Sequence, residues 1–348
     1  MEEKTLESVD EAVVSETPAE DQAPVTPATP AKPKKKIWEN WFVLCVLAYV
    51  FMLGGEIIGS MVVNVPVGMI AGFRAGKSGV TPEEMLQEGF SLADYLPDWV
   101  VTMTMYLVFI GIWIMFMILI LCIKGYKPVA KGLGTKAKGN TIAKFMIGFL
   151  IGFAMNGACI LAAHLNGDIK LYFDSFRPIS FVFILFCVFV QSSAEELVCR
   201  GFLYQMICKN YKPWVAIVVN SCFFGALHLM NPGVSVWAIV DIIVTGVLFS
   251  FMVYYMDSIW AAMAAHTSWN FCQNIVFGLL NSGQATPYSV FKLDAASARN
   301  SFAYNVDFGV ESTPLAIGIQ VVVAIVLFVW GYKCKKKPTN VWAEEQNA

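Results

Sequence analysis

The chain has 348 residues, of which 57% are hydrophobic and only 14% are charged, and its formal net charge at neutral pH is −2. Its mean hydropathy of +0.60 is far above that of a soluble protein of this length. The composition excludes an ordinary soluble enzyme, and the charge balance gives no sign of nucleic-acid binding.

The N-terminal segment 1–36 is acidic at first, then rich in Pro, Ala and Thr, and finally basic. It has too little apolar surface to fold alone, so we expect a disordered cytoplasmic tail. It lacks the order of a signal peptide, in which a short basic start leads directly into an apolar stretch, and no cleavage is expected.

Apolar segments follow that are long enough to cross a bilayer, which takes about 20 residues. Eight are expected, at roughly 41–63, 100–123, 142–164, 178–208, 214–230, 234–256, 258–280 and 314–332. The lysine-bearing connections then share one side of the membrane, and the acidic connection 74–99 lies on the other. The sequence thus predicts an all-α polytopic membrane protein, a bundle of about eight transmembrane helices with both termini cytoplasmic.

This arrangement divides the chain into four regions. They are the tail 1–36, the first two helices with their loops at 37–140, a helical core that carries the candidate chemistry at 141–281, and a polar loop, last transmembrane helix and basic tail at 282–348. Within the core, Gly148 and Gly152 have the spacing that lets two helices approach closely. Nine cysteines occur without any CxxC pair, so we expect small buried hydrophobes and neither a disulfide framework nor a cysteine metal site.

Two adjacent glutamates and an arginine lie inside the fourth predicted span, in the stretch Gln191-Ser-Ser-Ala-Glu-Glu-Leu-Val-Cys-Arg200. An ionised group near the bilayer centre costs about 2.5–3.5 kcal/mol, so such groups face a bundle interior or a wet cavity. On a helix, Glu196 and Arg200 are four apart and can pair, whereas Glu195 points elsewhere and has no local partner. Two interpretations of Glu195 are open: a carboxylate that holds a proton or a water for chemistry, or a protonated group bonded to another helix.

Two of the three histidines lie in comparable positions. His228 comes late in the fifth span, and His266 opens the stretch His-Thr-Ser-Trp-Asn270 in the seventh, where Asn270 shares its helix face. Gln273 and Asn274 extend that polar stripe, while His164 receives no role. Counted at 1.5 Å per residue from the cytoplasmic helix ends, Glu195, His228, His266 and Asn270 lie about 20, 22, 14 and 20 Å deep. Their convergence on one layer predicts a shared site.

A carboxylate, two imidazoles and an amide in a water-poor cavity suit amide hydrolysis, because a base activates water and donors stabilise the tetrahedral oxyanion. The serine elbow G-x-S-x-G, the zincin pattern H-E-x-x-H and the G-x-G-D pattern are absent from the predicted spans. Three ordered motifs instead span residues 195–200, 224–228 and 266–270. They are Glu-Glu-x-x-x-Arg, Phe-x-x-x-His and His-x-x-x-Asn, and over about residues 140–280 they resemble the CPBP (CAAX protease and bacteriocin-processing, or Abi) family of intramembrane proteases, which includes type II CAAX prenyl endopeptidases and proteins tied to bacteriocin immunity.

The resemblance implies an endopeptidase in which Glu195 and His228 activate water and His266 and Asn270 form the oxyanion hole. Glu196 enters with the paired-glutamate motif, and Arg200 as its orienting partner. No cofactor is expected, although Glu195, His228 and His266 could make a His₂Glu zinc site as a minority alternative.

The expected partners are the lipid bilayer and a hydrophobic or lipidated peptide or membrane-protein substrate. The acidic, Pro-rich tail and the lysine-rich loops indicate a bacterial plasma membrane. Two other classes remain open. One is a non-catalytic binding or immunity protein that uses the same cavity. The other is a proton-coupled transporter that uses the acidic residues Glu56, Glu195, Glu196 and Asp241, against which stands the lack of internal repeats.

Overall fold

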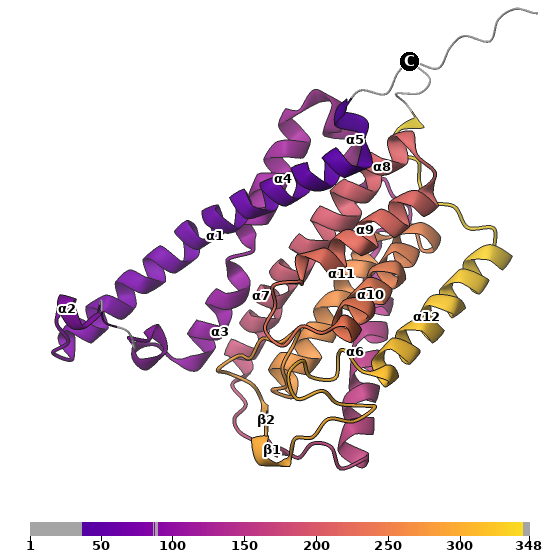
Figure 1. Ribbon diagram of the computed structural model, residues 1–348. Helices are drawn as coiled ribbons and strands as arrows, with labels where there is room; N and C mark the ends of the chain where they lie inside the picture. Colours follow the sequence, from indigo (N-terminus) through magenta and orange to yellow (C-terminus); the bar gives the residue numbers. More distant parts are fainter. Residues whose placement is uncertain (1–36, 86, 88–89, 344–348) are drawn as a thin grey trace, which may run out of the picture. The chain divides into compact units, whose positions relative to one another are not determined.

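A computed structural model describes residues 37–85, 87 and 90–343, so the predicted disordered tail lies outside the described residues. The chain is almost entirely helical (Figure 1). Its main helices are α1 (Trp41–Lys77), α3 (Asp98–Leu107), α4 (Ile110–Cys122), α6 (Ile142–Leu165), α7 (Pro178–Glu196), α8 (Tyr204–Asn210), α9 (Pro213–Leu227), α10 (Val236–Tyr255), α11 (Ile259–Asn270) and α12 (Pro314–Lys333). Short helices α2 (Pro82–Met85) and α5 (Lys127–Leu133) lie in the connections.

Six of the expected spans are long and apolar enough to cross a membrane within the described part of the chain. They are Trp41–Lys77, Asp98–Cys122, Ile142–Leu165, Pro178–Asn210, Val236–Tyr255 and Pro314–Lys333. The all-α membrane fold is therefore confirmed, whereas the count of eight and the side of the termini are not. The two expected spans that fall short have clear reasons. The helix α9 ends at Leu227 after 15 residues, and α11 carries the polar residues of the site.

Helix α11 lies at the centre of the fold, and every one of its residues except Trp260 is buried. It packs against α6, α7 and α10. Its alanines and the glycines of α6 explain the close approach, because a Cβ on Gly148 or Gly152 would overlap the backbone carbonyl of Ala261 or Ala265. The spacing of these two glycines was the sequence signal for this contact, and the prediction is confirmed.

Two segments of the α7–α8 and α11 regions are wound as π-helix, at Leu197–Leu203 and Phe271–Val276. Such segments widen a helix by one residue in a turn and are found mostly at functional sites. The first follows Glu195 and Glu196 directly, and the second follows Asn270. The motif that begins at Glu195 and the motif that ends at Asn270 thus lie where their helices depart from regular α geometry.

The polar segment between α11 and α12 folds over one end of the helices. Its strand β2 (Phe291–Leu293) pairs antiparallel with β1 (Leu171–Phe173), which follows α6. Asp168 fastens the same segment, since its carboxylate accepts hydrogen bonds from Arg299 Nε at 3.2 Å and Ser301 Oγ at 2.6 Å. This two-stranded sheet was not predicted from the sequence.

Candidate active site

The paired charges of α7 and the π-helical turn are fully buried. Arg200 Nη1 donates to Glu196 Oε1 at 2.9 Å, which confirms the predicted pair, and both side chains are 0% exposed. Arg200 Nη2 donates to the carbonyl of Gly246 at 3.0 Å, and the guanidinium lies 4.5 Å from the ring centre of Phe224. A buried ion pair is tolerated only with such additional contacts. Arg200 thus fixes the Glu196 carboxylate and connects α7 to α9 and α10.

Glu196 has a second partner that the sequence did not reveal. Its Oε1 lies 3.0 Å from Nδ1 of His266 on α11. A carboxylate oxygen only accepts, so this contact assigns a proton to Nδ1 of His266 and turns Nε2 toward the cavity. Glu196 is therefore more than the structural partner of Arg200, because it also orients an imidazole of the site and fixes its tautomer.

His228 is held from the opposite side. It follows the last residue of α9, where its Nδ1 lies 2.8 Å from the carbonyl oxygen of Phe224. A carbonyl accepts a hydrogen bond, so the proton of the neutral ring is on Nδ1 and the lone pair of Nε2 is free. The rings of Phe224 and His228 pack edge to face with their centroids 4.9 Å apart, and the guanidinium of Arg200 also lies over the Phe224 ring. The Phe-x-x-x-His motif therefore sets both the position and the tautomer of His228.

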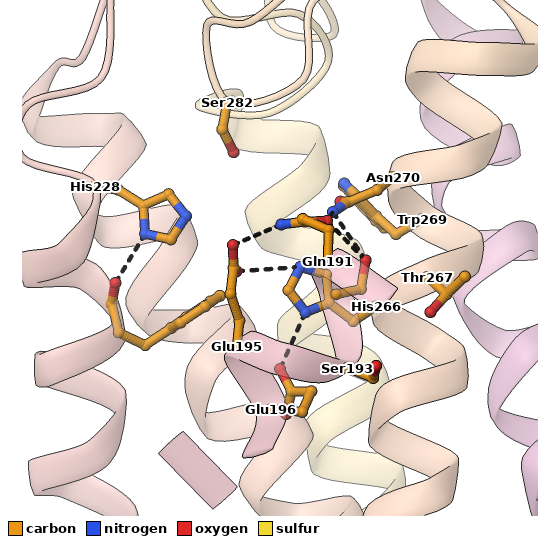
Figure 2. A network of polar contacts seen from close by, with 12 residues as sticks. Gln191, Ser193, Glu195, Glu196, His228, His266, Thr267, Trp269, Asn270 and Ser282 are labelled. Atoms are coloured by element: carbon orange, nitrogen blue, oxygen red, sulfur yellow. Dashed lines mark hydrogen bonds and ion pairs between the residues drawn. The ribbon is translucent and has the colours of Figure 1, made fainter. Parts of the chain in front are cut away.

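Glu195 lies between the two imidazoles in Figure 2. Its Oε2 is 3.7 Å from His266 Nε2 and accepts no hydrogen bond from the described residues. Its Oε1 accepts a hydrogen bond from Gln191 Nε2 at 2.5 Å, one helical turn earlier. The expectation that Glu195 lacks a local partner is thus wrong, because the amide of Gln191 orients one oxygen and leaves the other open.

These groups line one cavity of about 330 Å³. Four of the predicted site residues border it, namely Glu195, His228, His266 and Asn270, together with Gln191, Glu56, Asn231, Asn281, Ser282 and Gln284 among others. Glu196 and Arg200 do not line it and act from behind. The predicted convergence of the four polar residues on a shared site is thus confirmed, since all four line one cavity.

A directional chain of amides runs along the cavity wall. Gln191 donates to the carboxylate of Glu195 and accepts at Oε1 from Asn270 Nδ2 at 3.1 Å. Asn270 accepts at Oδ1 from Asn281 Nδ2 at 3.2 Å, and Asn281 also donates to Glu311 Oε1 at 3.1 Å. A carboxylate terminates each end, so the orientation of every amide between them is determined. Asn270 consequently points its NH₂ group at Gln191 and at Ser192 Oγ, which is 3.2 Å away. On the same helix, His266 has Nδ1 bonded to Glu196, so its Nε2 is the nitrogen that faces the cavity.

Glu311 is the acceptor that holds the far end of this chain. Besides Asn281, it accepts from Trp269 Nε1 at 2.8 Å and from the backbone N–H and hydroxyl of Ser282. Burial raises the pKa of Glu311, while the hydrogen bonds from Trp269 and Ser282 lower it. The segment that follows α11 is thereby fastened beside the cavity, which Asn281 and Ser282 line. Asn281, Ser282 and Glu311 escaped sequence analysis, because nothing in a polar loop indicates which helix it will contact.

The polar stripe predicted on α11 stops at Asn270. Gln273 accepts a hydrogen bond from Asn156 Nδ2 at 2.6 Å and donates to the carbonyl of Leu280, while Asn274 accepts from the hydroxyl of Tyr106 at 2.7 Å. Neither residue borders the cavity. Both side chains are taken up by hydrogen bonds to other segments of the chain, so the expected extension of the stripe is wrong.

The residues proposed for a metal do not form a ready ligand set. Within the described ranges, no group of three His, Cys, Asp or Glu side chains is arranged to hold a metal ion. His228 and His266 each have Nδ1 bonded, to a backbone carbonyl and to the Glu196 carboxylate, and metal-bound imidazoles commonly have such partners on their second nitrogen. The minority zinc site of Glu195, His228 and His266 therefore stays a prediction.

Comparison with known proteins finds similarity in the region that contains the candidate site. Residues 177–272 match the family model described as type II CAAX prenyl endopeptidase Rce1-like. That segment runs from α7 into the π-helical turn after α11 and contains all six predicted site residues. The resemblance read from the three motifs is confirmed over this segment, which is similar to the type II CAAX prenyl endopeptidase Rce1-like family.

The uncharacterized protein YyaK of Bacillus subtilis (strain 168) is 33% identical over 90 residues, which cover 25% of this chain and 30% of that protein. The similarity is thus confined to less than a third of the relative. No solved structure matches the chain.

Proposed function

We propose that the protein is an intramembrane endopeptidase that hydrolyses a peptide bond of a hydrophobic or lipidated substrate with a water activated by Glu195 and His228. The observation that carries the proposal is the carboxylate oxygen Oε2 of Glu195, which accepts no hydrogen bond from the described residues and lies beside two imidazoles. Each imidazole has its Nδ1 bonded to another group, the Phe224 carbonyl for His228 and the Glu196 carboxylate for His266. Groups so constrained keep their orientation through a reaction, which is what acid–base catalysis requires.

In the proposed reaction, a water lies between Oε2 of Glu195 and Nε2 of His228. The pair takes one proton as the water oxygen attacks the substrate carbonyl and forms a tetrahedral intermediate. The retained proton then passes to the leaving nitrogen as the C–N bond breaks, giving a new carboxyl end and a new amine. Both catalytic groups return to their starting state.

His266 supplies the charge stabilisation in this mechanism. Protonated at both nitrogens, it donates through Nε2–H to the developing oxyanion, and Glu196 stabilises that imidazolium from behind at 3.0 Å. Arg200 holds Glu196 in place. Asn270, whose NH₂ group is engaged by Gln191 and Ser192, positions the amide chain that orients Glu195.

A comparison of membrane peptides by mass spectrometry tests the function and identifies the substrate. Cells that produce the wild type should accumulate a shortened peptide that is missing from cells with Glu195→Gln or His228→Ala. Glu83→Gln, a matched change of an exposed glutamate on α2, is the control and should behave as wild type. Shortening that persists in both site variants would instead favour a binding protein without catalysis of its own.

A further inference from the structure

Glu56 is a carboxylate in the middle of the membrane-spanning helix α1, and it is half-buried. None of the described residues donates a hydrogen bond to it or forms an ion pair with it. An ionisable group within a span is expensive unless it faces a cavity or a partner. Glu56 does line a cavity, the one that contains Glu195.

The position of Glu56 is fixed by the crossing of α1 and α4. A Cβ on Gly55 would overlap the backbone of Ile112 in α4, and one on Gly59 would overlap the carbonyl of Val108 in the turn before α4. A Cβ on Gly111 would overlap the carbonyl of Gly55. Such backbone contact is possible only for glycine at these positions. The tight crossing thus fixes the rotation of α1, and with it the side of the helix from which Glu56 lines the cavity.

Glu56 and Glu195 also lie at a similar depth. Glu56 is 15 residues from the start of α1 at Trp41, which is about 22 Å along an α-helix. Glu195 is likewise 15 residues from the end of α8 at Asn210, a somewhat shorter distance because Leu197–Leu203 is π-helical. The two ends are neighbours, because α8 contacts both α1 and the turn at Ile37–Glu39 that precedes it. The two carboxylates thus line the same cavity at a similar level.

The charges that line the cavity are unbalanced. It contains the two carboxylates, two histidines and several neutral amides, and none of the described residues that line it is Lys or Arg. Arg200 is turned away and paired with Glu196. Glu195 is oriented by Gln191 and lies near His266, whereas none of the described residues donates a hydrogen bond to Glu56. Glu56 thus offers an entering cation a carboxylate that the proposed chemistry does not use.

We propose that Glu56 forms a binding subsite for a cationic group of the substrate: a Lys or Arg side chain or a free α-amino group close to the bond that is cleaved. The cleavage part of this statement rests on the proposed function, but the binding part does not. A bound ammonium would neutralise the second carboxylate of the cavity and align the peptide across the wall that carries Glu195. The cavity would correspondingly select against a carboxylate at that position of the substrate.

Binding to a cleavage-inactive protein tests the subsite without relying on catalysis. The probe is a set of fluorescent hydrophobic dodecapeptides, acetylated at the N-terminus, in which one lysine is moved through every position. The reference peptide carries norleucine instead, and a second reference carries norleucine with a free α-amino group. Affinities are measured for full-length His228→Ala protein in detergent, alone and combined with Glu56→Gln.

We expect at least one lysine peptide, or the free-amine peptide, to bind about tenfold or more tightly than the acetylated norleucine peptide. Glu56→Gln, which keeps the shape of the side chain, should reduce this preference to about twofold or less, and Glu83→Gln should leave it intact. The position that responds distinguishes an internal cation from an N-terminal one. Glu56→Lys should reverse the preference toward a peptide with glutamate at that position.

Two results would overturn the proposal. Equal affinities for all lysine, free-amine and norleucine peptides would show that the cavity does not recognise a cation. A preference that survives Glu56→Gln would assign recognition to another group and would fit a Glu56 that carries a proton. If the preference depends on Glu56 while no peptide is ever cleaved by the wild type, the subsite stands and the proposed protease function fails.

Discussion

Breaking the buried Glu196–Arg200 pair from one side should be far more damaging than removing both charges together. Arg200→Met leaves Glu196 as a carboxylate with 0% exposure that has lost its 2.9 Å partner, and it also leaves the Gly246 carbonyl without its donor. Losing one member of a buried pair destabilises a protein by about 3–5 kcal/mol. Glu196→Gln should fall in the same range, because it strands the guanidinium between Gly246 and the ring of Phe224.

The double variant Glu196→Gln/Arg200→Met carries no stranded charge, and Met fills much of the volume of the arginine stem. We expect it to be destabilised by about 1–3 kcal/mol, mainly from the unpaired Gly246 carbonyl and imperfect packing. The coupling free energy in the double-mutant cycle should therefore exceed about 2 kcal/mol. Unfolding by sodium dodecyl sulfate in mixed micelles, followed by tryptophan fluorescence, provides the free energies. Additive effects would refute the reasoning, since they would mean that water reaches each charge when its partner is absent.

Three further changes test other parts of the account. Gly111→Val should separate α1 from α4, because its side chain overlaps the carbonyl of Gly55, and we expect reduced thermal stability and faster hydrogen exchange in α1; unchanged exchange would contradict that crossing. Glu311→Ala leaves the donors of Trp269, Asn281 and Ser282 unsatisfied, so the loop after α11 should gain protease sensitivity, whereas Glu83→Gln should not. Burial would raise the pKa of Asp168, but hydrogen bonds from Ser301, Asn166 and Arg299 keep it below its ordinary value. Its contribution to stability is thus present above about pH 4 and lost as the pH falls further, so Asp168→Asn should lower the melting temperature at pH 7 and lose that effect in acid; an equal effect at both pH values would contradict this assignment.

The candidate site residues could be found from the sequence because charged and strongly polar side chains are unfavourable in lipid. Charged and strongly polar groups in apolar spans must face inward, so Glu195, His228, His266 and Asn270 could be brought together by depth alone. The i,i+4 pair of Glu196 and Arg200 followed from helix geometry, and the glycine contact of α6 from its spacing. These signals are local in the sequence, so they can be recognised without a three-dimensional structure.

Other features depend on contacts between distant segments and were out of reach. The bond of Glu196 to His266 joins residues 70 positions apart, and the one of Asn281 to Glu311 depends on how a polar loop folds back. Gln273 likewise bonds Asn156, 117 positions earlier in the chain, and does not line the cavity. The count of eight spans is likewise not confirmed, because α9 has only 15 residues and the buried helix α11 carries the polar residues of the site.

The rate of peptide hydrolysis by Glu195→Gln tests the central claim most directly. With the substrate identified from membrane peptides, purified wild type, Glu195→Gln and the control Glu83→Gln are compared in detergent under single-turnover conditions. Loss of the base that activates water should slow cleavage by about a hundredfold or more, while the control keeps the rate of the wild type. A Glu195→Gln protein that is correctly folded and cleaves within about tenfold of the wild-type rate would contradict the assignment of Glu195 as the catalytic base.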